Sequence, residues 1–131
     1  MRICIDTNIY SALKKGNPEI RKILENADEI YIPSIVLGEL YAGFQMGSKL
    51  RKNIKDLKEF IELPGIYIID LGESIAERYG LLIKILKENG TPLPTNDVWI
   101  SATALENGAR IATFDEHFQL VPGLMITEIN L

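Results

Sequence analysis

Four acidic residues of this sequence occupy positions from which carboxylates could act together in catalysis. Asp6 directly follows the apolar stretch RICI, and Asp115 directly follows ARIATF, so each lies just beyond a predicted strand. Glu39 and Asp97 lie in segments whose apolar spacing predicts helices, one after the second strand and one before the fourth. Because the carboxyl ends of parallel strands meet at one edge of a sheet, we expect these four side chains to gather there.

The helical spacing also places two of these acids on apolar faces. At about 100° per residue, Glu39 falls beside Val36, Leu40 and Gly43, whereas Asp97 lines up with Ile100, Ser101 and Ala104. A carboxylate on an apolar face is costly unless it is paired or binds a metal, and few basic residues are placed to neutralise these acids. Oxygen ligands on separate elements suit Mg²⁺ or Mn²⁺. We therefore expect a divalent cation that activates water for phosphodiester hydrolysis, as in metal-dependent nucleases.

The charge balance bears on whether nucleic acid is a plausible partner. The net charge of −4 is unlike that of most nucleic-acid-binding domains. Without the four candidate acids, however, 14 acidic residues balance 14 basic ones, so the negative total comes from the predicted site. The one basic cluster comprises Lys49, Arg51, Lys52, Lys55 and Lys58. Such a cluster is usually the solvated face of an amphipathic helix, and a partner surface or phosphate-tracking patch is the alternative.

Length and composition restrict the class of protein. A chain of 131 residues with 47% hydrophobic and 24% charged residues predicts one globular domain, which we place at 1–131. No apolar run approaches the ~20 residues of a membrane-spanning helix, and no secretory signal is recognisable, so we expect a cytoplasmic protein without membrane contact. The single cysteine, Cys4, cannot form an intrachain disulfide, which agrees with a reducing compartment.

Predicted strands alternate with predicted helices along the whole chain. Strands are expected at 3–5, 29–33, 66–70, 109–114 and 124–129, and helices at about 7–15, 18–27, 35–47, 49–63, 73–89 and 96–107. Asn17, Ser34 and Ser48 are the predicted N-caps of three of these helices. This order predicts an α/β fold, a mostly parallel sheet with helices on both faces.

Four short motifs resemble those of a known family. They are DTN at Asp6, GEL at Glu39, NDVWISATAL at Asp97 and ATFDEHF at Asp115, and together they resemble a PIN-domain protein of the VapC type. VapC proteins are the toxin ribonucleases of bacterial and archaeal toxin–antitoxin pairs. The resemblance implies a PIN-like fold with a parallel sheet of about five strands, its first strand near the middle. It also implies Mg²⁺- or Mn²⁺-dependent endonucleolytic cleavage of RNA, homodimers, and inhibition by a cognate VapB-type antitoxin.

The resemblance assigns roles to individual residues. The acidic quartet of the family is matched by Asp6, Glu39, Asp97 and Asp115, and we expect Asp6, Asp97 and Asp115 to bind the metal. Thr113 matches a hydroxyl expected to orient an acid, and Asn8 matches a polar residue with a similar role. Ser101 stands where the family often has alanine, and we expect it to pack. No substrate-binding residue is assigned.

Simpler structural roles remain open for several of these residues. Asp6 and Asp97 also suit helix N-termini, and Asp115 suits a turn. Glu116 could assist the site as an outer acid, and His117 is expected to be structural.

Other polar and aromatic residues have no assigned place in the site. Asp70 ends a strand expected at or near the sheet edge, which favours a turn or cap. Tyr79 and Trp99 are expected in the core or a dimer contact. Arg78 and Lys84 are candidates for contact with the scissile phosphate or with an antitoxin, and their roles stay open.

Three other functions compete with a toxin ribonuclease. A PIN nuclease of RNA processing would use the same acids. A Mg²⁺-binding phosphoacceptor signalling domain would need an aspartate ending the third strand and a lysine ending the fifth, and the segment LMITEINL has no lysine. A catalytically silent binding scaffold would be expected to lack at least one of the four acids, and all four are present.

Overall fold

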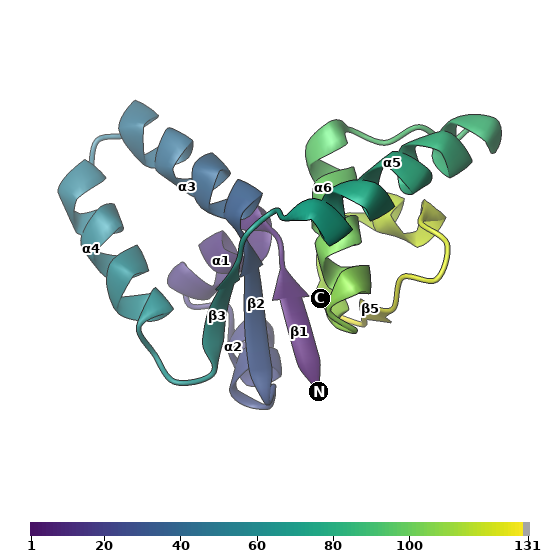
Figure 1. The fold of residues 1–131 in the computed structure, drawn as a ribbon. Helices are drawn as coiled ribbons and strands as arrows, with labels where there is room; N and C mark the ends of the chain where they lie inside the picture. The colour runs from purple at the N-terminus through teal and green to yellow at the C-terminus, as the bar shows by residue number, and fades with distance from the viewer. Residues whose placement is uncertain (130–131) are drawn as a thin grey trace.

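A five-stranded parallel sheet organises the molecule. The computed structural model describes residues 1–129. The strands are β1 (Arg2–Ile5), β2 (Glu29–Pro33), β3 (Ile66–Ile69), β4 (Arg110–Ala112) and β5 (Ile126–Thr127), and they lie in the order β3-β2-β1-β4-β5 (Figure 1). All four neighbouring pairs are parallel. The predicted α/β class, the central place of the first strand and the edge place of the third are confirmed.

The apolar sequence of β1 follows from its central place. Cys4 is paired with Tyr31 of β2 on one side and with Ile111 of β4 on the other. Ile3, Cys4 and Ile5 are all buried, because helices cover both faces of the sheet. A strand without a solvent face has no need for alternating polar residues.

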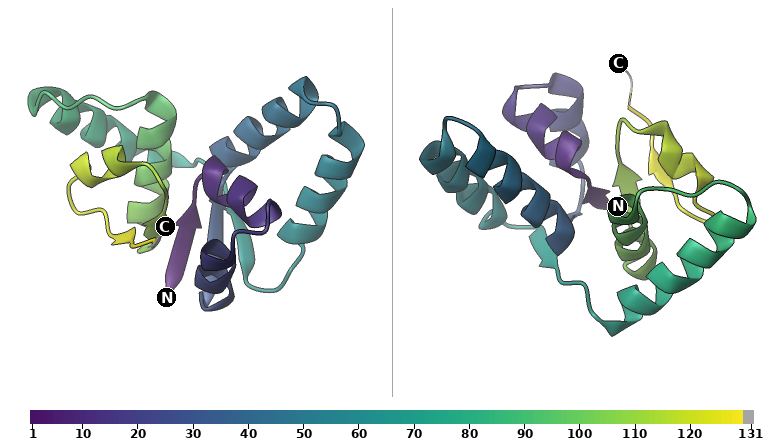
Figure 2. Two further views of the ribbon diagram at one scale, coloured as in Figure 1. Left: turned by 180° about the vertical axis from the view of Figure 1, so that it is seen from behind. Right: turned by 90° about the horizontal axis from the view of Figure 1, so that it is seen from above.

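Six α-helices and a short 3₁₀-helix connect the strands. They are α1 (Thr7–Lys14), α2 (Pro18–Glu25), α3 (Ser34–Met46), α4 (Leu50–Ile61), α5 (Glu73–Glu88), α6 (Thr95–Glu106) and η1 (Glu116–Leu120). In Figure 2, α1 to α4 lie on one side of the strands, and α5 and α6 lie on the other. Within residues 1–129, no helix is long and apolar enough to cross a membrane.

The connections create a switch point between β1 and β4. The chain moves outward from β1 to β2 and β3, and α5 and α6 then carry it across the sheet to β4 on the other side of β1. Crevices at such switch points, beyond the carboxyl ends of the strands, are where ligands bind in open α/β sheets. Asp6 and Thr113 directly follow the two strands that flank this point.

The predicted helix starts are confirmed in one case and wrong in two. Asn17 caps α2, because its Oδ1 accepts hydrogen bonds from two backbone amides of the first turn. Ser34 is already the first residue of α3, and the N-cap is Pro33. Ser48 lies outside α4, whose N-cap is Lys49 without a side-chain hydrogen bond. Strands β4 and β5 are also shorter than predicted, since the chain leaves the sheet after Ala112 and pairs only briefly at its other edge.

The buried apolar side chains form two clusters. The larger one includes Ile3, Ile5, Ile111 and Phe118 and lies around the sheet. The smaller one joins α5 to α6 and consists of Ile75, Leu82, Leu86, Val98, Ala102 and Val121. Because α6 carries Asp97, this second cluster holds one of the candidate acids in place.

Truncation of a buried leucine tests the importance of the α5–α6 contact. Leu86 is 1% exposed, so Leu86→Ala should lower the free energy of unfolding by about 2–5 kcal/mol in urea denaturation. Leu81 lies on the same helix and is 53% exposed, so Leu81→Ala is the matched control, with an expected loss of less than about 0.5 kcal/mol. Equal losses for the two variants would contradict the assigned packing.

Candidate active site

Asp6 is held in a fixed orientation at the carboxyl end of β1. Its Oδ1 accepts a hydrogen bond from the Ile9 amide at 3.0 Å, which makes Asp6 the N-cap of α1. Its Oδ2 accepts one from the Thr113 hydroxyl at 2.5 Å. The residue is only 6% exposed, and within residues 1–129 no basic side chain forms an ion pair with it. Asp6 is therefore both a cap and a buried carboxylate without a cationic partner.

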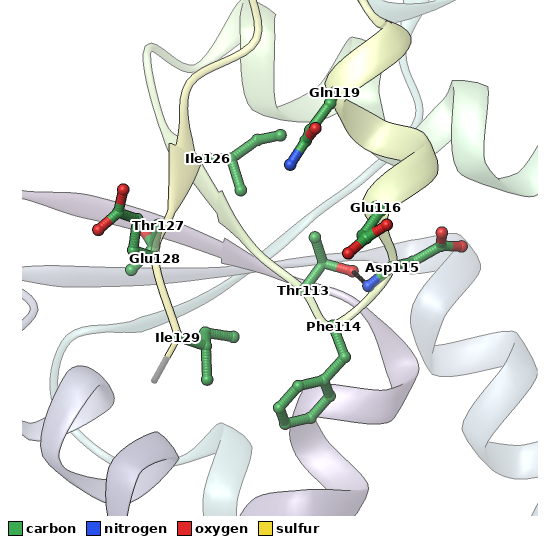
Figure 3. A pocket seen from close by; sticks show the side chains of 9 residues that line it. All are labelled: Thr113, Phe114, Asp115, Glu116, Gln119, Ile126, Thr127, Glu128 and Ile129. Atoms are coloured by element: carbon green, nitrogen blue, oxygen red, sulfur yellow. Dashed lines mark hydrogen bonds between the residues drawn. The ribbon is translucent and has the colours of Figure 1, made fainter. Parts of the chain in front are cut away.

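Thr113 connects Asp6 to Asp115. While its hydroxyl donates to Asp6, it accepts a hydrogen bond from the Asp115 amide at 3.0 Å (Figure 3). The expected contact between Thr113 and an acid is thus present. Asp115 caps η1 by accepting from the His117 amide at 2.9 Å, and His117 Nδ1 lies 2.9 Å from the same carboxylate oxygen. His117 thus contacts one of the four acids, and the structural role expected for it stays a prediction.

Glu39 lies on α3 between the buried residues Val36 and Leu40 and is partly buried itself. The predicted face does not continue to Gly43, which is exposed because the second half of α3 extends away from the sheet. The Glu39 carboxylate accepts a hydrogen bond from the Thr7 hydroxyl at 2.8 Å, and Asn96 Nδ2 lies 3.4 Å from its other oxygen.

Asn96 is a site residue that the sequence analysis missed, and Thr7 of the DTN motif was given no partner there. Each is adjacent in sequence to a predicted acid, since Thr7 follows Asp6 and Asn96 precedes Asp97. That adjacency was the available signal, but nothing in the sequence shows that both side chains meet Glu39. Asn8, which we expected to help instead, is exposed and makes no side-chain hydrogen bond within the described chain. Its role stays a prediction.

Asp97 has the orientation predicted from its helix. It is partly buried in the first turn of α6, and Ile100, Ser101 and Ala104 on the same face are all buried. The Ser101 hydroxyl donates to the Asp97 backbone carbonyl at 2.8 Å and not to the carboxylate. Ser101 is therefore a packed residue whose polar group is satisfied within its own helix, as expected.

The four acids lie within electrostatic reach of one another. Burial raises the pKa of Asp6, and the charges of Asp115 and Glu39 add to this effect, whereas the hydrogen bonds from Thr113 and Ile9 oppose it. Burial also raises the pKa of Asp97, with contributions from Asp115, Glu39 and Asp6. Four carboxylates from separate elements are thus brought together at the edge where the sequence predicted them.

The side chains of this site suit a hard cation by type. Carboxylate oxygens are the preferred ligands of Mg²⁺ and Mn²⁺, and the mutual repulsion of the acids favours a bound positive charge. Within residues 1–129, no three His, Cys, Asp or Glu side chains are yet close enough together to enclose one ion. The structure therefore shows an acidic cluster of suitable chemistry rather than a finished coordination shell.

A cavity of about 310 Å³ opens beside the cluster. Thr113, Asp115 and Glu116 lie on one side of it, and Ile126 and Thr127 of β5 lie on another (Figure 3). Glu116 thus lines the cavity next to Asp115, which is compatible with the outer position considered for it. The site has room for a ligand directly beside two of its polar residues.

Other candidates from the sequence have partners or places elsewhere. Arg78 forms an ion pair with Glu106, and Lys84 lies 4.0 Å from Glu88 on the same helix. Asp70 is exposed beyond the edge strand β3.

The rings of Tyr79 and Trp99 stack on each other between α5 and α6, with centroids 3.9 Å apart and planes at 12°. These rings therefore contribute to the contact between the two helices.

Neutralisation of Asp97 tests the repulsion between the acids. Because the pKa of Asp97 is raised in the folded state, its charged form destabilises the fold. This loss of stability is absent below the ordinary carboxyl pKa and is complete above the pKa of the folded state. In EDTA, Asp97→Asn should therefore raise Tm near neutral pH, and the gain should disappear as the pH falls through the acidic range.

Asp56 provides the control of opposite sign. A hydrogen bond from Lys52 lowers the pKa of Asp56, so its charge stabilises the fold above the ordinary carboxyl pKa. Asp56→Asn should lower Tm near neutral pH, by a small amount because this ion pair is at the surface. A decrease in Tm for Asp97→Asn near neutral pH would contradict the assigned repulsion.

Comparison with known proteins gives one family throughout. The PIN domain model matches residues 3–124. Ribonuclease VapC1 of Rickettsia felis is 27% identical over 132 residues, which cover 99% of this chain and 98% of that protein. Ribonuclease VapC1 of Haemophilus influenzae strain R2866 is 29% identical over 126 residues, 92% of each.

Solved structures agree with the sequence relatives. VapBC2 from Rickettsia felis, bound to a DNA fragment from its promoter, superposes with a TM-score of 0.86 at 29% identity over 97% of this chain and 98% of that one. VapBC-1 from nontypeable Haemophilus influenzae has a TM-score of 0.86 at 26% identity and covers 98% of both chains. Because the family model spans nearly all of the sheet and every helix described above, the chain belongs to the PIN domain family.

Proposed function

We propose that this chain is an endoribonuclease that acts as the toxin of a VapBC-type toxin–antitoxin pair. The observation that carries the proposal is the acidic cluster at the switch point, where burial, together with the charges of Glu39 and Asp115, raises the pKa of Asp6 and Asp97. Full-length relatives named as VapC ribonucleases, and VapBC complexes of the same fold, support the toxin assignment over a PIN nuclease of RNA processing. The phosphoacceptor alternative gains no support, since Asp70 lies beyond the edge strand.

Each residue of the site has a separate role in the proposed reaction. Mg²⁺ or Mn²⁺, held by Asp6, Asp97 and Asp115, would supply an activated water and offset the negative charge that develops on the phosphate oxygens. Thr113 and the Ile9 amide hold the two oxygens of Asp6 in place. Thr7 and Asn96 hold Glu39, which would accept the proton of the attacking water.

The partners follow from the same relatives. RNA is the proposed substrate, and a VapB-type antitoxin is the proposed inhibitor, because the solved neighbours are complexes of VapB with VapC. Assembly as a homodimer and a cytoplasmic location belong to the same proposal.

Removal of one carboxylate tests catalysis. Asp6→Asn and Asp97→Asn should each lower the rate of RNA cleavage by about 100-fold or more, because each removes a charged oxygen ligand from the proposed metal site. The rate is measured on total bacterial RNA with the purified protein, and circular dichroism verifies the fold. Asp70→Asn, a change of the same type beyond an edge strand, should cleave at the parent rate. Cleavage by both site variants at the parent rate would refute the proposal.

Metal addition provides a readout independent of cleavage. EDTA should abolish activity, and Mg²⁺ or Mn²⁺ should restore it. A metal at about ten times its Kd should also stabilise the parent by about 1.4 kcal/mol, visible as a higher Tm. Asp6→Asn and Asp97→Asn should lose most of this metal-dependent increase, whereas Asp70→Asn should keep it. An equal increase in all four proteins would place the metal outside the acidic cluster.

A further inference from the structure

A second pocket lies between α1, α3 and α4, and the charge of its lining is opposite to that of the acidic cluster. It has a volume of about 410 Å³, and four lysines line it: Lys14, Lys15, Lys49 and Lys52. Asp56 is the only acidic residue of its lining, and Tyr10 and Phe44 add two aromatic rings. We refer to it as the lysine pocket.

A single carboxylate cannot balance the charge of the lysine pocket. Asp56 lies 2.9 Å from the Lys52 ammonium and 3.9 Å from that of Lys14. Within residues 1–129, neither Lys15 nor Lys49 forms an ion pair. In a chain with a net charge of −4, this concentration of positive charge is a local feature that favours an anionic ligand.

Tyr10 supplies a second, independent indication of a missing ligand. The residue is 3% exposed, its ring packs edge-on against Phe60, and its buried hydroxyl has no hydrogen-bond partner in the described chain. Burial, with help from the charge of Asp56, raises the pKa of Tyr10 to about 12, so the hydroxyl stays a donor. Tyr10 is itself one of the residues that line the lysine pocket. Buried donors normally have an acceptor, and here none is provided by the described chain.

Helix α1 connects this pocket to the acidic cluster. Asp6 caps the N-terminal end of α1, whereas Lys14 is its last residue and Lys15 follows directly. Eight helical residues span about 12 Å, so the two sites are a short distance apart along one element. A single ligand that reaches both sites is therefore extended, and the part of it that lies in the lysine pocket is negatively charged.

We propose that the lysine pocket binds the sugar–phosphate backbone of the RNA substrate, a few nucleotides from the bond that is cut. This inference rests on the proposed ribonuclease function. Lys15 and Lys49 contact phosphate oxygens. The Tyr10 hydroxyl, which is covered in the free protein, becomes exposed when RNA binds and donates to the bound nucleotide. A base can lie against Phe44, since aromatic side chains are common supports for unpaired bases.

An acidic protein segment is the competing ligand, and two features favour RNA. The cavity volume falls in the range of sites for small organic ligands, and a carboxylate side chain alone would leave most of it empty. The pocket also lies about 12 Å along α1 from Asp6, a distance that a single-stranded RNA in the proposed cleavage site can span. Of the basic cluster on α4, only Lys49 and Lys52 line the pocket, whereas Arg51, Lys55 and Lys58 are exposed outside it.

RNA binding by charge-matched variants tests the proposal. The probe is a fluorescent single-stranded RNA of about 12 nucleotides, bound at about 50 and about 200 mM salt by protein carrying Asp6→Asn to prevent cleavage. Lys15→Gln/Lys49→Gln should weaken binding about tenfold and reduce the salt-dependence slope by about 1.4, as expected for two lost phosphate contacts. Arg51→Gln/Lys58→Gln removes the same charge outside the pocket and should change the affinity less than about twofold.

Tyr10→Phe separates binding from stability. This change removes only the hydroxyl, which is buried without a hydrogen-bond partner. Since an unpaired buried polar group destabilises the fold, Tm should stay the same or increase. RNA affinity should nevertheless decrease about threefold, since one hydrogen bond to the ligand disappears. An unchanged RNA affinity for Tyr10→Phe would remove the hydroxyl from the proposed contact.

Several results would overturn the lysine pocket as an RNA site. The first is an equal loss of RNA affinity in Lys15→Gln/Lys49→Gln and Arg51→Gln/Lys58→Gln, and the second is no RNA binding by the parent. The third uses polyglutamate as an acidic protein probe: the pocket variant loses polyglutamate binding but keeps RNA binding. The last result would identify a surface for an acidic protein. If the pocket variants lose RNA binding but the parent protein, which retains Asp6, cuts no RNA, the ribonuclease proposal fails and the assignment of the pocket as an RNA site stands. Cleavage by the parent, with RNA binding unchanged in the pocket variants, would refute the pocket alone.

Discussion

The hydrogen bond from Thr113 to Asp6 is the contact on which the arrangement of the site depends. It joins two residues 107 positions apart, and it exists only because β1 and β4 are neighbours in the sheet. The same hydroxyl accepts from the Asp115 amide, so one side chain sets the positions of two acids. The helices that cross the sheet between β3 and β4 then bring Asp97 to this edge. Sheet order, more than any single motif, therefore assembles the cluster.

The cluster stores unfavourable electrostatic energy that the rest of the fold has to offset. Burial and like charges raise the pKa of Asp6 and Asp97, and within residues 1–129 neither has a cationic partner. The apolar cluster between α5 and α6 and the buried strand β1 hold these acids in place despite the repulsion. Helix α1 separates this negative end from the positive lysine pocket at its other end. The net charge of −4 does not reveal that negative and positive charges are concentrated at opposite ends of α1.

Much of the fold was predictable because its signals are local. Periodic apolar residues predicted all five strands and the six α-helices but not the 3₁₀-helix η1. The Asn17 cap was correct because its hydrogen bonds reach only the next turn. Ser34 and Ser48 were wrong as caps because a cap depends on the backbone at the start of the helix as well as on residue type. The faces of Glu39 and Asp97 followed from the helical repeat, although α3 leaves the core before Gly43.

The sequence alone determined the fold class, the four acids and the edge of the sheet to which they belong, since each depends on spacing within one segment. The tertiary structure decided which groups hold those acids. Thr7 and Asn96 meet Glu39 across 32 and 57 residues, and no local pattern specifies such pairs. The tertiary structure also brings Lys49 and Lys52, but not the other basic residues of their cluster, together with Lys14 and Lys15 at the C-terminal end of α1. Contacts between distant segments depend on strand order and helix packing, which act through space rather than along the chain.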